Sequence, residues 1–64
     1  MFIVSTYNIY DGEEIIHHEF DSVVDAIQDY KTLLILSTDG TSAPMLYLST
    51  GEIIYGLGEE VEGF

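Results

Sequence analysis

The sequence predicts a single α+β domain in which one helix packs on an antiparallel sheet of four to five strands. Only Phe20–Lys31 has apolar residues at helical spacing. The segments before and after it are rich in β-branched and aromatic residues, which favour strands. Asp-Gly and Thr-Gly dipeptides lie between these segments and predict tight turns. The element order expected from these observations is ββαβββ.

The length and composition limit how such a domain can be stabilised. A chain of 64 residues forms a small core, and without cysteine it has no disulfide to support it. Because 47% of the residues are apolar, the chain is unlike a disordered acidic segment. We expect residues 1–57 to fold as one domain and residues 58–64 to form an acidic C-terminal tail. Small domains often gain stability by self-association, so a homodimer is an alternative to the monomer.

Residues 2–10 and 13–20 are expected to form a β-hairpin around Asp11-Gly12. A two-residue loop would pair Ile3 with Phe20 and Tyr7 with Ile16. The face predicted to form the core then carries Ile3, Tyr7, Ile9, Ile16 and Phe20. The opposite face carries Phe2, Val4, Tyr10 and Ile15, and is predicted to be half of an interface.

The predicted helix begins near Asp21 or Ser22, either of which can cap its N-terminus. Its buried side is expected to hold Val23, Ala26, Ile27 and Tyr30. The other side carries Asp21, Asp25 and Asp29. Four residues of helix rise about 6 Å, so these carboxylates would form a row with a spacing similar to that of successive phosphates. The alternative interpretation is an ordinary solvated helix face.

Three further strands are expected after the helix. The continuous apolar run Leu33–Ser37 is typical of a central strand covered on both faces. Met45–Ser49 and Glu52–Leu57 are expected to follow it, with a tight turn at Thr50-Gly51. Pro44 is expected to lie in a loop outside the interior of the sheet.

The charge is the most unusual property of the sequence. Twelve carboxylates and one basic residue, Lys31, give a net charge of −11. Such a surface repels nucleic acids and anionic membranes. It attracts basic proteins and accelerates their association. The alternative is that the charge serves only solubility.

No pattern in the sequence predicts catalysis. The chain has no cysteine nucleophile and no glycine-rich phosphate-binding loop. His17 and His18 are adjacent in a predicted strand and would point to opposite faces, so they are not expected to hold one metal ion. We therefore expect no enzyme activity, no cofactor and no metal site. The start of the chain lacks a basic leader region and the chain lacks a long apolar run, so a cytoplasmic location is expected.

The last six residues, Glu59 to Phe64, alternate acids with apolar or small residues and end in phenylalanine. They resemble the acidic tip of single-stranded-DNA-binding proteins, which inserts its terminal phenylalanine into an apolar pocket rimmed by basic residues. Val61 and Gly63 interrupt the acids, and the preceding domain lacks the basic, aromatic groove of that family. The alternative is that this segment is a frayed tail, or that Phe64 packs on the domain.

These observations favour a small acidic interaction protein that inhibits a basic, nucleic-acid-binding host protein by imitating phosphates. Nucleases, CRISPR effectors, repair enzymes and RNA polymerase are the candidate partners, and phages or mobile elements are the typical source. In that case the location is the host cytoplasm. The predicted anionic contacts are Glu13, Glu14, Glu19, Asp21, Asp25, Asp29, Glu59, Glu60 and Glu62, with Tyr10 and Phe64 as aromatic anchors. The alternative is a homo-oligomeric structural or accessory subunit without mimicry.

Overall fold

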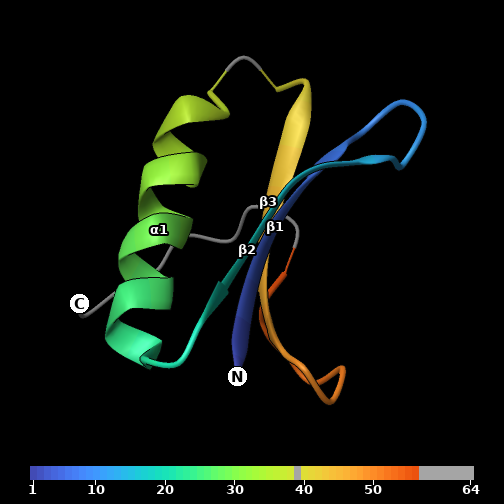
Figure 1. The fold of residues 1–64 in the computed structure, drawn as a ribbon. Helices are drawn as coiled ribbons and strands as arrows, with labels where there is room; N and C mark the ends of the chain where they lie inside the picture. The colour runs from blue at the N-terminus through green and yellow to red at the C-terminus, as the bar shows by residue number, and fades with distance from the viewer. Residues whose placement is uncertain (39, 57–64) are drawn as a thin grey trace.

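A computed structural model describes residues 1–38 and 40–56 of the chain. The element order is β1 (Phe2–Asn8), β2 (Glu14–Phe20), α1 (Val23–Leu36), β3 (Ser42–Leu48) and β4 (Ile53–Tyr55). The four strands form one antiparallel sheet in the order β2-β1-β3-β4. The helix lies along one face of this sheet (Figure 1). The predicted α+β class is therefore confirmed.

The core lies between α1 and the sheet. The helix contributes Ala26, Ile27, Tyr30 and Leu33, and the central strands contribute Val4 and Leu46. Tyr30 is fully buried, and its ring stacks on that of Tyr55 with the centroids 5.6 Å apart. The half-buried residues that pack around this core are Phe2, Ile16, Phe20, Leu34 and Tyr55. The predicted buried side of the helix is confirmed for Ala26, Ile27 and Tyr30, whereas Val23 is 39% exposed.

The predicted strand at Leu33–Ser37 is wrong, because residues 33–36 form the last turn of α1. A short apolar run fits a buried strand or a helix equally well, and here Leu33 continues the spacing of Ala26 and Tyr30. Ser37 ends the helix: its N–H group donates to the Leu33 carbonyl over 3.0 Å, and its hydroxyl donates to the same oxygen over 2.7 Å. The described residues therefore contain four strands, in the order ββαββ.

The predicted register of the first hairpin is also wrong by one residue. Phe2 pairs with Phe20 and Val4 with His18, and a β-bulge follows at Thr6/Tyr7. The loop spans residues 9–13 and is longer than the two-residue turn expected, although Gly12 does adopt a positive φ of 74°. A shift of one residue exchanges the two faces of β1. Val4 is therefore buried in place of Ile3, and the predicted interface loses Phe2 and Val4 to the core.

Pro44 lies inside β3 opposite Thr6 and is buried, so its expected place outside the sheet is wrong. The pairing of β4 explains why proline fits there. β4 pairs only with Leu46 and Tyr47, so β3 has β1 as its only described neighbour strand at the level of Pro44. A missing N–H group is tolerated on such a free side.

Two leucines in α1 test the position of the helix in the core. Leu33→Ala removes a buried side chain and should lower the free energy of unfolding by about 2 to 5 kcal/mol. Leu36 is 71% exposed, so Leu36→Ala should change it by less than about 0.5 kcal/mol. Urea denaturation followed by circular dichroism measures both values. Equal losses of unfolding free energy in the two variants would contradict this position of α1 on the sheet.

Candidate functional site

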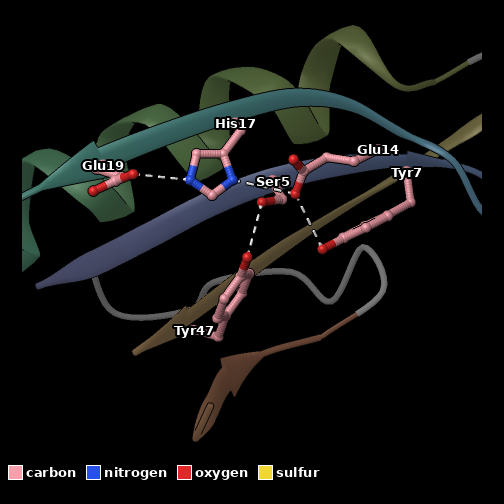
Figure 2. A network of polar contacts seen from close by, with 6 residues as sticks. All are labelled: Ser5, Tyr7, Glu14, His17, Glu19 and Tyr47. Atoms are coloured by element: carbon pink, nitrogen blue, oxygen red, sulfur yellow. Dashed lines mark hydrogen bonds and ion pairs between the residues drawn. The ribbon is translucent and has the colours of Figure 1, made fainter. Parts of the chain in front are cut away.

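The sheet has a face that the helix does not cover. Val4 and Leu46 are paired and point toward α1. Neighbouring residues in a strand point to opposite sides, so Ser5, Tyr7 and Tyr47 lie on the uncovered face. Figure 2 shows these side chains with those of Glu14, His17 and Glu19, which come from the edge strand β2.

A polar network joins β2 to β1 on this face (Figure 2). The Glu14 carboxylate accepts a hydrogen bond from the Tyr7 hydroxyl at 3.3 Å and contacts Nδ1 of His17 at 3.2 Å. Nε2 of His17 lies 3.1 Å from the Glu19 carboxylate. Only a protonated imidazole can donate from both ring nitrogens at once. This geometry therefore favours a charged His17 between two carboxylates.

The network changes the acidity of its members. Hydrogen bonding to Glu14, and then to Glu19, raises the pKa of His17 above its ordinary value of 6.5. The same bond to His17 lowers the pKa of Glu14 below its ordinary value of 4.5. Burial, followed by a hydrogen bond with Tyr47, raises the pKa of Tyr7. The shifts of His17 and Glu14 both favour the ion pair between these two residues.

The second histidine connects the helix to the sheet. As the sequence predicts, His18 points to the other face of β2 from His17, and its Nδ1 lies 2.9 Å from a carboxylate oxygen of Asp29. The Asp29 side chain is only 22% exposed. The ring of His18 also meets that of Phe20 edge-on, with the centroids 6.3 Å apart. Asp29 therefore holds α1 against β2, a structural role that the sequence did not predict.

The three aspartates predicted to form one row differ in their surroundings. Asp21 precedes the N-cap residue Ser22 and is exposed. Asp25 lies in the first turn of α1 and is exposed, where its negative charge interacts favourably with the helix dipole. Asp29 is half-buried and bound to His18. The row is therefore not a uniform set of solvated anions, and two of its members stabilise the helix or its packing.

The loop between β1 and β2 carries further acids and projects away from the helix (Figure 1). Asp11 and Glu13 are exposed on it, Glu14 is exposed at the start of β2, and Tyr10 is 80% exposed. Asp11 accepts a hydrogen bond from the N–H group of Glu13 at 2.9 Å, and Asn8 accepts one from that of Tyr10 at 2.8 Å. These bonds order the loop.

An open hollow of about 570 Å³ lies beside this loop. It is lined by Tyr7, Asn8, Ile9, Gly12, Ala43 and Met45. This hollow could not be predicted from the sequence, because it forms only when β3 lies next to β1. Ile9 was assigned to the core, yet it is 53% exposed at the edge of the hollow.

The structure thus brings some of the predicted contact residues together and leaves others apart. Glu13, Glu14, Glu19, Asp21 and Asp25 follow one another along the loop, β2 and the start of α1, and all are exposed. Glu59, Glu60, Glu62 and Phe64 lie outside the described residues. Within residues 1–38 and 40–56, no group of three or more His, Asp or Glu side chains is placed to hold a metal ion.

Comparisons with protein-family models, curated proteins and solved structures gave no match. In the part of the chain that the structure describes, α1 is too short and too polar to cross a lipid bilayer.

The network around His17 predicts a pH-dependent stability. Because folding raises the pKa of His17, its contribution is full below pH 6.5 and is lost as the pH rises through the folded value. The lowered pKa of Glu14 makes its contribution full above pH 4.5 and lost as the pH falls through the folded value. His17→Gln should therefore lower the melting temperature most between about pH 5 and 6, and least near pH 8.5.

Glu13→Gln is the matched control, because Glu13 is exposed on the same loop and lies outside the network drawn in Figure 2. Its melting temperature should follow that of the wild type at every pH. A difference between His17→Gln and the wild type that does not vary with pH would contradict the ion pair.

Proposed function

We propose that the protein is an interaction protein that binds and inhibits a basic, nucleic-acid-binding host protein by presenting carboxylates in place of phosphates. The observation that supports this most is the run of exposed acids from the β1–β2 loop to the start of α1. Its members are Asp11, Glu13, Glu14, Glu19, Asp21 and Asp25. Within this run Glu14 and Glu19 contact His17, and the whole chain has only one lysine and no arginine.

The physical basis is that a groove built for phosphates also accepts carboxylates. Arginine binds both groups through paired, charge-assisted hydrogen bonds. A surface with a large charge of one sign also steers an oppositely charged partner toward it. The exposed acids extend from the β1–β2 loop along β2 to the start of α1, so the anionic surface can meet several basic side chains of a partner.

The class of partner follows from the same charge. Nucleases, CRISPR effectors, repair enzymes and RNA polymerase carry basic surfaces of this kind, and a phage or mobile element gains from blocking them. The protein would then act in the host cytoplasm. It would bind neither nucleic acid nor an anionic membrane directly, because both repel its charge. This role requires no cofactor and no catalytic residue.

A homo-oligomeric accessory subunit is the second candidate. Three exposed apolar side chains near the loop support it, namely Ile9, Tyr10 and Ile15. Phe2 and Val4, which were expected to extend this surface, instead pack in the core. Sedimentation velocity distinguishes the candidates: a stable homo-oligomer that does not bind basic proteins would favour the accessory subunit.

Selective removal of charge tests the proposal. The variant with Asp11→Asn, Glu13→Gln, Asp21→Asn and Asp25→Asn removes exposed acids and keeps the Asp29–His18, Glu14–His17 and Glu19–His17 contacts. Immobilised wild-type protein should retain a nucleic-acid-binding protein from a host lysate and release it with rising salt or with duplex DNA. The variant should retain roughly a tenth as much or less, at a cost of about 1.4 kcal/mol or more in binding.

Glu52→Gln is the control, because Glu52 lies at the β3–β4 turn, at the opposite end of the sheet from the β1–β2 loop. It should retain the partner as the wild type does. Retention that duplex DNA does not compete away, or that the four substitutions leave unchanged, would contradict the proposed mimicry.

A further inference from the structure

The hollow beside the β1–β2 loop combines an apolar surface with an acidic rim. Tyr7, Ala43 and Met45 line it from β1 and β3, and Ile9 lines it from the loop. Its volume of about 570 Å³ can hold a large apolar side chain together with part of the backbone that carries it. Its apolar lining favours an apolar ligand group, since burying such a group is what stabilises binding in a site of this kind.

Three acidic residues lie next to residues that line the same hollow. Tyr7 lines the hollow, and its hydroxyl donates to Glu14 at 3.3 Å. Gly12 lines the hollow, and its chain neighbours Asp11 and Glu13 are both exposed. A ligand in the hollow therefore lies beside a chain segment that carries three acidic residues.

Backbone hydrogen bonds within the loop, and from the loop to the chain before β3, fix the shape of the hollow. Gly12 N–H donates to the Asn8 carbonyl and Asn8 N–H to that of Glu13, both over 2.8 Å. Ile9 N–H donates to the Thr41 carbonyl over 3.2 Å, which ties the loop to the chain just before β3. A site that is already ordered loses less conformational entropy when a ligand binds.

We propose that this hollow binds an apolar side chain from a protein segment in which lysine or arginine flanks that side chain. This inference rests on the proposed function and names the point at which the basic partner docks. The acidic rim selects the occupant by charge. A second copy of this chain would bring the same acids to the rim and be repelled, and so would an anionic lipid surface or a nucleic acid.

Two synthetic peptides test the proposal with purified protein. One has the sequence Arg-Lys-Leu-Lys-Arg, and the other has serine in place of leucine, so that both carry the same charge. The leucine peptide should bind the wild type about tenfold more tightly by isothermal titration calorimetry, as burial of one large apolar side chain predicts. Both affinities should fall with rising salt.

Ile9→Ser and Ile53→Ser form a matched pair of variants. Ile9 is 53% exposed at the hollow, whereas Ile53 is 59% exposed and pairs with Tyr47, level with Ile3 near the other end of β1. The preference for leucine should disappear in Ile9→Ser and persist in Ile53→Ser. If Ile9→Ser does not fold, Glu13→Gln replaces it, and it should weaken the binding of both peptides.

The outcomes separate this inference from the proposed function. Equal, salt-dependent binding of both peptides to the wild type would overturn the docking of an apolar side chain and leave the anionic surface intact. Loss of the leucine preference in Ile53→Ser would also overturn the assignment to this hollow. Binding of neither peptide at low salt would overturn both proposals.

Discussion

Tyr30 is fully buried where α1 crosses the sheet, stacked on Tyr55 and packed in the same core as Val4 and Leu46. Each large side chain buried in this way contributes about 1.5 to 3 kcal/mol. Within the described residues α1 is the one helix, and it covers one face of the sheet. The other face carries polar and charged side chains of β1 and β2, among them Tyr7, Glu14 and His17.

Both histidines of the chain bind carboxylates. His17 lies between Glu14 and Glu19 on the uncovered face, and His18 binds Asp29 on the helix side. Three carboxylates are thus engaged in the fold, while Asp11 and Glu13 on the loop and Asp21 and Asp25 at the start of α1 stay exposed. This division separates the acids that stabilise the domain from those available to a basic partner.

Much of the fold follows from local patterns in the sequence. The β-branched segment of β1, the start of the helix at Ser22 and the burial of Ala26, Ile27 and Tyr30 all depend on near neighbours. The errors have a common physical origin, because each depends on contacts between distant residues. Leu33 joins the helix because the core extends to it, and Pro44 fits β3 because β4 is short.

The candidate site, too, could be predicted only where it depends on residues that are close in the sequence. The charge, the turn acids and the opposite orientation of His17 and His18 could be predicted from spacing alone. The Asp29–His18 contact spans eleven residues, and the hollow needs β3 beside β1, so neither could be predicted without the tertiary structure. The register error had the largest consequence, since it assigned Ile9 to the core and Val4 to the surface.

A nuclear magnetic resonance titration tests the central claim most directly, namely that the acidic surface from the loop to the start of α1 binds basic partners. Labelled protein is titrated with the leucine-containing basic peptide at low salt, and the backbone amide shifts are followed. We expect shifts that concentrate in residues 7–19, 21–25 and 43–45 and weaken as salt is added. Shifts centred on Ile35 and Leu36, or no shifts at low salt, would contradict it.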